Sequence, residues 1–263
     1  MEQCLQNVVD QHCAEAEHLV MDGASTDETP EIVAKWAEKY PHIRLISEKD
    51  KGQSDAMNKG IDLAKGKIIS FLNVDDYYEP KVLNRVLEIF TDLPEPSFVC
   101  GNLNIWNADG SLKHFNKPDR ISLVELASNC FEWPYNPSAY FYHKSLHEKT
   151  GPYNVDNHYC MDYEFLVEAA RHIQLTHVDE LWGNFVIVPG SKTENSFRTD
   201  INIALNNAEV IRQKVLLGFS QNEKEQLNTI LHQFSPLPVP IESTTLTLIQ
   251  KLTSGFRQIF NWK

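Results

Sequence analysis

Two acidic clusters in the first third of the chain directly follow short apolar runs. The run at residues 18–22 ends in Asp22, and the run at residues 67–72 leads to Asp75 and Asp76. If both runs are neighbouring parallel strands, these carboxylates meet at the carboxyl edge of the sheet, where open α/β sheets bind ligands. Carboxylate oxygens suit Mg²⁺ or Mn²⁺, and these ions in turn suit a diphosphate. The pattern predicts a metal-assisted enzyme that acts on a nucleotide diphosphate compound.

The charge balance agrees with a bound cation. The 263 residues carry 36 acidic and 24 basic side chains, for a formal net charge of −12. This balance argues against general nucleic-acid binding, which relies on Lys and Arg against phosphates. An acidic protein with an anionic nucleotide ligand needs a local positive charge, and a metal ion supplies one.

The five cysteines indicate free thiols in a reducing compartment. Their number is odd and no pair has C-x-x-C spacing, so neither a disulfide framework nor a zinc site is expected. No run of about 18 apolar residues is present, which predicts no transmembrane helix. The first eleven residues include an early acid and no apolar core, unlike a signal peptide.

The elements that position the acidic clusters alternate between strand and helix. We expect strands over residues 18–22, 43–47, 67–72 and 98–106, and helices over 2–11, 27–40, 53–65 and 80–91. Ser25 or Thr26 is expected to cap the helix at 27–40, and Pro80 to lie in the first turn of the helix at 80–91. The second half predicts helices over 122–130, 162–171, 199–217 and 222–233, and strands over 173–178 and 181–188. The fold class is therefore α/β, with a mainly parallel (mixed) sheet, helices on both faces and a C-terminal helical extension.

Several motifs in this order resemble family 2 glycosyltransferases of the GT-A fold. They are DGASTDET, SEKDKGQSDAMNKG, FLNVDDYY and MDYEF, with a G-N pair and a later A-D-G between the last two. The resemblance covers roughly residues 2 to 195. It implies an enzyme that transfers a sugar from a nucleotide-diphosphate sugar, with a UDP-sugar as donor and a saccharide or lipid-linked acceptor.

The resemblance implies a set of donor-binding residues, which are Asp22, Asp50, Gln53, Asn58, Asp75 and Lys192. Asp22 matches the aspartate that contacts the base, and the loop with Lys192 resembles the one that closes on the donor diphosphate. Gly52 lets backbone approach a ligand closely. Simpler alternatives remain open: Asp22 as a turn residue, Asn58 bonding the turn backbone instead of the ribose, and Lys192 as a solvated lysine.

The resemblance also places the metal and the catalytic base. Family members often carry D-x-D-D where this chain has Asn73, Val74, Asp75 and Asp76, so Asp76 and Asp75 are the expected ligands of Mn²⁺ or Mg²⁺. Asp162 matches the base of inverting members, which must reach the acceptor hydroxyl. The alternative is that Asp162 is only an acidic residue at the N-terminus of a helix, where the helix dipole stabilises it.

An aromatic segment and the tail carry further expectations. Trp133 and Tyr135 are read either as sugar-stacking or as core aromatics. The domains expected are a GT-A-like domain over 1–195 (nucleotide-binding half 1–110, acceptor half 111–195), a helical extension over 196–234, and a Pro-rich linker with a basic amphipathic tail over 235–263. The tail either packs on its own domain or lies on an anionic membrane. We expect a cytoplasmic protein, with peripheral contact to the inner face of the plasma membrane as the further alternative.

One departure from the family pattern concerns the first element. Family members usually open with a central strand before the first helix, whereas this chain starts at that helix. The expected function is an inverting glycosyltransferase in cell-surface polysaccharide or glycolipid synthesis. The alternative is a catalytically impaired or truncated nucleotide- or sugar-binding remnant of such an enzyme.

Overall fold

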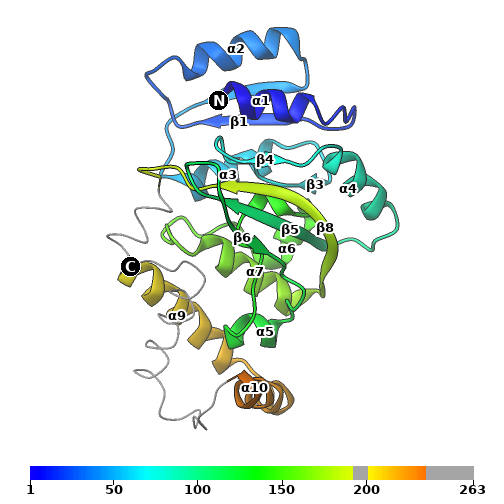
Figure 1. The fold of residues 1–263 in the computed structure, drawn as a ribbon, viewed down its shortest axis with the longest axis vertical. Helices are drawn as coiled ribbons and strands as arrows, with labels where there is room; N and C mark the ends of the chain where they lie inside the picture. The colour runs from blue at the N-terminus through cyan, green and yellow to red at the C-terminus, as the bar shows by residue number, and fades with distance from the viewer. Residues whose placement is uncertain (192–200, 235–263) are drawn as a thin grey trace.

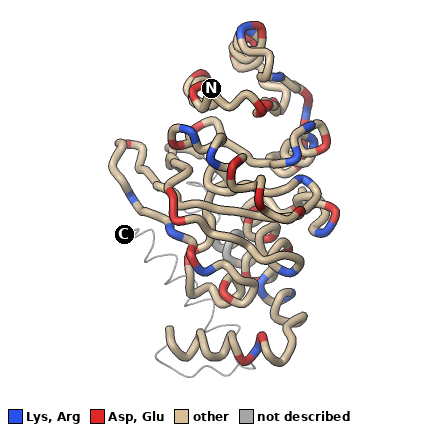
Figure 2. The backbone as a smooth tube through the Cα atoms, turned by 90° about the vertical axis from the view of Figure 1, so that its right-hand side faces the viewer, with Lys and Arg blue, Asp and Glu red and all other residues tan. Residues whose placement is uncertain are grey.

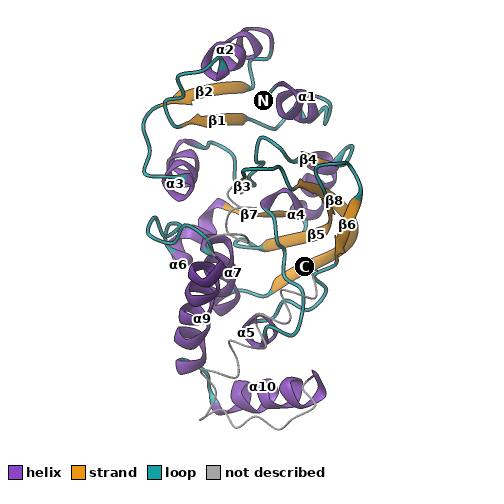
Figure 3. Cartoon of the chain, turned by 60° about the vertical axis from the view of Figure 1, so that its left-hand side comes forward, coloured by secondary structure: helices purple, strands orange, loops and turns teal. Residues whose placement is uncertain are grey.

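The computed structural model describes residues 1–191 and 201–234 (Figure 1). Lys192 and the tail expected over residues 235–263 lie outside the described residues. The described chain is a mixed α/β fold, with a small α/β layer at one end, a curved sheet in the middle and helices at the other end (Figures 1 and 3).

Two parallel strands form the small sheet. β1 (His18–Asp22) pairs with β2 (Ile43–Ser47), and α2 (Thr29–Lys39) connects them. Val33, fully buried on α2, packs against Val20 of β1. This layer therefore has a core of its own beneath the ends of β1 and β2.

The helix α1 (Glu2–Val9) joins the small sheet to the larger one. Its Leu5 packs in the core of the small sheet, while Val8 packs in a second cluster beneath the larger sheet. The Asn7 side-chain amide donates to the Tyr78 carbonyl at 3.0 Å and accepts from the Tyr78 N–H at 2.9 Å. Among the described residues no strand of the small sheet pairs with a strand of the larger one.

The larger sheet is mixed and mostly antiparallel. Its strands lie in the order β3 (Ile68–Ile69), β7 (Tyr140–His143), β5 (Phe98–Trp106), β8 (Leu175–Val186) and β4 (Tyr77–Tyr78), and β6 (Leu112–Asn116) also pairs with β5. The parallel pair is β5 with β8, and every other pairing described in this sheet is antiparallel.

Helices cover both faces of the larger sheet. The helices after β2 are α3 (Gln53–Leu63), α4 (Val82–Thr91), α5 (Leu123–Ser128), α6 (His147–Thr150), α7 (Met161–His172), α9 (Ile201–Leu217) and α10 (Gln221–Phe234). Of these, α9 and α10 pack mainly on α5 and α7. Because successive strand residues point to opposite faces, Tyr140 and Tyr142 face the core shared with α7, while Phe141 faces the cluster with α4. Acidic and basic residues are interspersed along the described chain (Figure 2).

The expected α/β class is confirmed, with differences in the strands. Strands at 18–22, 43–47 and 98–106 agree with β1, β2 and β5. Only Ile68–Ile69 of the run at 67–72 is paired, and the two strands expected over 173–188 form the single strand β8. The sheet is also less parallel than expected, because β4, β6 and β7, which were not expected as strands, pair antiparallel with their neighbours.

The expected caps of two helices were wrong. α2 begins at Thr29 with Glu28 at the N-cap, so neither Ser25 nor Thr26 caps it. Ser25 is engaged elsewhere, because its N–H donates to the carboxylate of Asp22. Likewise α4 begins at Val82, after the left-handed Lys81, which leaves Pro80 just before the helix rather than in its first turn.

Candidate functional site

Asp22 ends β1 as a buried carboxylate whose hydrogen bonds are made mainly through one oxygen. Its Oδ2 accepts hydrogen bonds from the Ser47 hydroxyl at 2.6 Å and from the Ser25 N–H at 3.1 Å. Burial raises the pKa of Asp22, but the hydrogen bonds from Ser25 and Ser47 outweigh it and leave the pKa below its usual range. Asp22 is thus ionised at neutral pH and held where β1 and β2 end together.

Asp50 follows β2 and lies against the turn after β1. A Cβ added at Gly23 would meet Asp50 Oδ2 at 2.7 Å, so a larger residue at this position would displace the Asp50 carboxylate. Asp50 Oδ1 also accepts from the Gly52 N–H at 2.8 Å. Gly52 begins α3 with φ of 117°, a conformation that L side chains rarely adopt.

The start of α3 links these loops to the second acidic cluster. The Gln53 amide donates to Asn73 Oδ1 at 3.3 Å. Further along α3, Asn58 donates to the Tyr153 carbonyl at 2.9 Å and accepts from the Tyr153 N–H at 2.9 Å. This pairing holds the loop before α7 and favours the structural alternative for Asn58, whose role toward a ribose stays a prediction.

The two adjacent acids after β3 lie in opposite environments. Asp76 is 3% exposed, and its Oδ2 accepts from the side chains of Asn73 at 2.7 Å and Asn136 at 2.8 Å, while Oδ1 accepts from the Val186 N–H at 3.1 Å. Burial raises the pKa of Asp76 to about 6. Asp75 is exposed. The expected pair of metal ligands is therefore divided into one internal and one solvent-facing carboxylate.

Asn136 is a site residue that sequence reasoning missed. It is 3% exposed and connects the aromatic loop before β7 to Asp76. Its Oδ1 accepts from the Ser138 N–H at 2.8 Å, so both ends of the amide are used. In the sequence this segment was singled out only for its aromatic residues, and the adjacent Asn136 carried no separate signal. In the same loop, Trp133 packs against Tyr163 with ring centroids 5.6 Å apart, which favours the core alternative for this aromatic.

Asp162 lies in the first turn of α7, next to the beginning of α3. The neighbouring Met161 is contacted by the Ser54 hydroxyl at 2.8 Å, so the two helix starts adjoin. Asp162 Oδ1 accepts a hydrogen bond from the Tyr140 hydroxyl at 2.9 Å. Tyr140 itself is fully buried, so it fixes the orientation of a carboxylate that is only partly buried.

The residues present suit a divalent cation bound together with a ligand. Among the described residues no group of three or more His, Cys, Asp or Glu forms a metal centre. Mg²⁺ and Mn²⁺ bound to nucleotides take one or two carboxylates from the protein and complete their shell with phosphates and water. The exposed Asp75, with the oxygen of Asn73 nearby in the same turn, matches that donor set.

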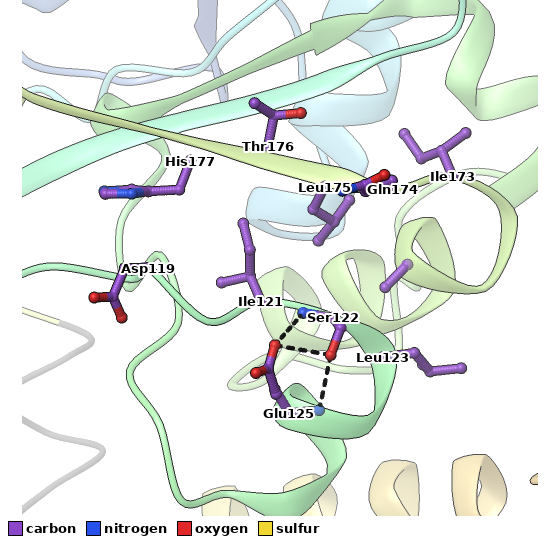
Figure 4. A pocket seen from close by; sticks show the side chains of 11 residues that line it. Asp119, Ile121, Ser122, Leu123, Glu125, Ile173, Gln174, Leu175, Thr176 and His177 are labelled. Atoms are coloured by element: carbon purple, nitrogen blue, oxygen red, sulfur yellow. Dashed lines mark hydrogen bonds between the residues drawn. The ribbon is translucent and has the colours of Figure 1, made fainter. Parts of the chain in front are cut away.

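A separate hollow of about 570 Å³ lies at the start of β8, away from these carboxylates (Figure 4). Its walls come from the segment before α5 and from the end of α7 with the start of β8, including Asp119, Glu125 and His177. Glu125 closes the capping box of α5 with Ser122 there. The site residues contact the other end of β8, at Val186, so the hollow is distinct from the candidate site.

In the part of the chain that the structure describes, the helices are too short or too polar to cross a bilayer.

Comparison with known proteins places the chain among sugar-transferring enzymes. The family model for glycosyl transferase family 2 matches residues 1–150. The PGL/p-HBAD biosynthesis glycosyltransferase of Mycobacterium bovis (strain BCG / Pasteur 1173P2) is 29% identical over 191 residues, which is 68% of this chain and 72% of the relative. Chondroitin synthase of Pasteurella multocida (strain Pm70) is 26% identical over 192 residues, 71% of this chain and 19% of the relative.

Two solved structures have a similar fold. S. aureus TarS 1-349 in complex with UDP-GlcNAc has a TM-score of 0.62 and 15% identity, over 99% of this chain and 84% of TarS. The mannosyltransferase PcManGT from Pyrobaculum calidifontis, in complex with GDP-Man and Mn²⁺, has a TM-score of 0.55 and 17% identity, over 100% of this chain and 84% of PcManGT. At these identities the likeness shows the fold.

Proposed function

The chain belongs to glycosyl transferase family 2, with the GT-A-type fold, and we propose that it moves a sugar from a nucleotide-diphosphate sugar to an acceptor hydroxyl with inversion. We place this transfer in cell-surface polysaccharide or glycolipid synthesis. Relatives named for PGL/p-HBAD biosynthesis and as chondroitin synthase support that setting. Neighbours solved with UDP-GlcNAc, UDP and GDP-Man support a nucleotide-sugar donor.

One observation carries the proposal: the starts of α3 and α7 adjoin through Ser54 and Met161. α3 begins beside the loops that carry Asp22 and Asp50, and its Gln53 reaches Asn73. α7 begins with Asp162. This arrangement supports a single site formed by Asp22, Asp50 and Asp162, although Asp162 is more than a hundred residues from the other two in the chain.

In the proposed reaction Asp162 accepts the proton of the acceptor hydroxyl as that oxygen attacks the anomeric carbon. The Tyr140 hydroxyl holds the carboxylate in position. Asp22 and Asp50 hold the nucleoside between the ends of β1 and β2. Asp75, with the oxygen of Asn73, would hold Mn²⁺ or Mg²⁺, which when bound neutralises the negative charge of the departing diphosphate.

The role of Asp76 in this proposal differs from that of Asp75. Both of its oxygens are occupied by internal donors, and it is buried. We therefore assign Asp76 to positioning: it ties the turn with Asn73 to the loop with Asn136 and to the end of β8. The ligand role that the sequence suggested for both acids falls to Asp75.

The test is release of nucleoside diphosphate from UDP-GlcNAc and GDP-Man with saccharide and glycolipid acceptors, with and without Mn²⁺. The proposal expects Mn²⁺-dependent release that Asp162→Asn lowers by about two to four decades while binding of UDP with Mn²⁺ is retained. Binding of UDP without turnover on any donor and acceptor would instead favour a nucleotide-binding remnant.

A further inference from the structure

The end of β5 has one covered face and one open face. Leu103 and Ile105 are fully buried, whereas Asn104 and Trp106, which point to the opposite face, are only partly buried. At this level β6 and β8 lie on the two sides of β5, and β4 pairs with β8 (Figure 3). The strands β6, β5, β8 and β4 therefore present one continuous surface on the side of Asn104 and Trp106.

The strand register places four side chains in one row across this surface. Tyr77 of β4 pairs with Asn184 of β8, and Asn184 pairs in turn with Asn104 of β5. Asn104 pairs on its other side with Phe115 of β6. Side chains of paired residues point to the same face, and neighbouring strands lie about 4.8 Å apart, so the row from Tyr77 to Phe115 is about 14 Å long.

Aromatic side chains are exposed along this row. Tyr77 is 37% exposed at one end, and Phe115 is 44% exposed at the other. Trp106 lies between them, because its indole Nε1 donates to Asn184 Oδ1 at 2.8 Å. Contiguous exposed apolar groups mark interaction surfaces, whereas single exposed apolar residues need no such explanation. The surface with Tyr77, Trp106 and Phe115, called the aromatic face, is therefore a candidate binding surface.

The centre of the aromatic face is polar. Asn184 is fully buried there, and Trp106 orients its amide, since the indole N–H can only donate and therefore meets Oδ1. Asn104 Nδ2 donates to the same oxygen at 3.3 Å, and Asn184 Nδ2 donates to Glu79 Oε1 at 2.8 Å. Neither Asn104 Oδ1 nor Glu79 Oε2 accepts a hydrogen bond from another of the described residues, and both side chains are partly exposed. These two oxygens are available to the hydroxyl groups of a ligand.

The aromatic face begins at the acidic turn after β3. Tyr77 directly follows Asp76, whose Oδ1 accepts from the Val186 N–H at 3.1 Å. Val186 in turn is paired with Trp106. One end of the surface thus adjoins the turn that carries Asp75, the carboxylate proposed to hold the metal.

The proposed base lies on the same side of the sheet. Tyr140, which donates to Asp162, is paired with Cys100 of β5. Cys100 and Asn104 point to the same face, because the irregularities in register insert residues into β8 and β6 and leave β5 regular. Four residues of a strand span about 13 Å, which separates the row at Asn104 from the sugar unit whose hydroxyl Asp162 deprotonates.

We propose that the aromatic face binds those sugar units of an oligosaccharide acceptor that lie next to the unit being glycosylated. This inference rests on the proposed function. The C–H faces of sugar rings stack on aromatic side chains, and their hydroxyls donate to oxygens such as Asn104 Oδ1 and Glu79 Oε2. A few polar groups placed among aromatic side chains are typical of ligand sites. A protein partner matches less well, because charged residues are depleted from the core of protein interfaces, whereas Glu79 lies at the centre of this surface.

The test is NMR of the full chain with ¹⁵N-labelled tryptophan, titrated without donor against cellotetraose, chitotetraose and a chondroitin tetrasaccharide. The Trp106 indole signal is assigned from a Trp106→Phe spectrum, and Trp36, on α2 in the small layer, is the internal reference. We expect at least one tetrasaccharide to shift the Trp106 signal and to leave that of Trp36 unchanged. Phe115→Ala and Tyr77→Ala should each raise the Kd of that tetrasaccharide about tenfold, as expected for the loss of one stacked ring.

Phe234→Ala is the matched control. Phe234 is 54% exposed at the end of α10, which packs on α5 and lies away from the aromatic face (Figure 1). We expect Phe234→Ala to keep the parental Kd. The proposal is overturned if no tetrasaccharide shifts the Trp106 signal, or if folded Phe115→Ala and Tyr77→Ala both bind like the parent. A Trp106 signal that moves with protein concentration in the absence of sugar would also overturn it, in favour of a contact between two copies of the chain.

A kinetic arm separates the aromatic face from the proposed function. With a donor and acceptor that turn over, we expect Phe115→Ala to raise the KM of a tetrasaccharide acceptor about tenfold more than that of the corresponding monosaccharide. If Phe115→Ala changes both KM values equally or changes neither, the aromatic face is not part of the acceptor site, although the proposed transfer stands. If a tetrasaccharide binds through Phe115 but no pair of donor and acceptor turns over, the saccharide site stands and the proposed function fails.

Discussion

Truncation of the two adjacent acids after β3 is expected to have opposite consequences. Asp76→Ala should mainly destabilise the fold, and Asp75→Ala should mainly remove metal-dependent donor binding. The sequence motif treats these acids alike. The structure separates them, because Asp76 is 3% exposed while Asp75 is exposed. Each of the two variants therefore serves as the control for the other.

The magnitude for Asp76→Ala follows from its donors. The variant leaves the Asn136 amide and the Val186 N–H without their acceptor, and each such loss costs about 1–3 kcal/mol in a buried setting. The third donor, Asn73, is partly exposed and can turn to water. The variant also removes a buried carboxylate, whose charged form is disfavoured by burial, as the raised pKa of Asp76 indicates. This gain offsets part of the stability lost with the hydrogen bonds. We expect a net loss of about 2–4 kcal/mol in the free energy of unfolding, given these donor costs.

The assay is thermal unfolding with and without UDP and Mn²⁺. A domain of this size shifts its Tm by about 2–4 °C per kcal/mol, so Asp76→Ala should lower the Tm by about 5–15 °C without ligand. Asp75→Ala should keep the parental Tm within about 2 °C, as expected for an exposed side chain, but lose the Mn²⁺-dependent rise caused by UDP. If Asp76→Ala melts with the parent, or if Asp75→Ala keeps the full ligand-induced rise, the assignment of the two roles is refuted.

Three further predictions concern other parts of the molecule. Asp162→Asn should lower turnover by about two to four decades at unchanged UDP affinity, measured by product release and calorimetry, and turnover within about threefold of the parent would contradict the base role. Gly23→Ala should displace the Asp50 carboxylate, which a Cβ would meet at 2.7 Å, and weaken UDP binding about tenfold with little change in Tm; an unchanged Kd would remove Asp50 from the donor site. Burial, assisted by His42, lowers the pKa of His18 from 6.5 to about 4, so the neutral imidazole stabilises the fold above pH 6.5 and this stability is lost as the pH falls toward 4. Unfolding free energies at pH 7 and pH 5 should therefore differ more in the parent than in His18→Gln, and equal differences would show that His18 does not titrate in this way.

Local patterns predicted the elements that carry the donor side of the site. The apolar residues of β1, β2 and β5 placed these strands correctly, because they are recognisable in the sequence without knowledge of the strands' partners. The edge strand β4 and the interior strand β7 were missed because neither shows a recognisable local pattern. Tyr77–Tyr78 is too short to show a period, and Tyr140–His143 is buried on both faces, so its side chains show no alternation between apolar and polar.

The sequence by itself determined which chemistry was available: carboxylates after apolar runs, in the order typical of one enzyme family, with a further acid at the start of a later helix. Residue types and local spacing carry that information. Only the tertiary structure decided what each carboxylate does. Asp76 turned inward because Asn136 and Val186, distant in sequence, supply its donors. Asp162 gained the Tyr140 hydroxyl as its hydrogen-bond donor in the same way. Burial and hydrogen-bond partners are set by contacts between distant segments, and no local pattern encodes them.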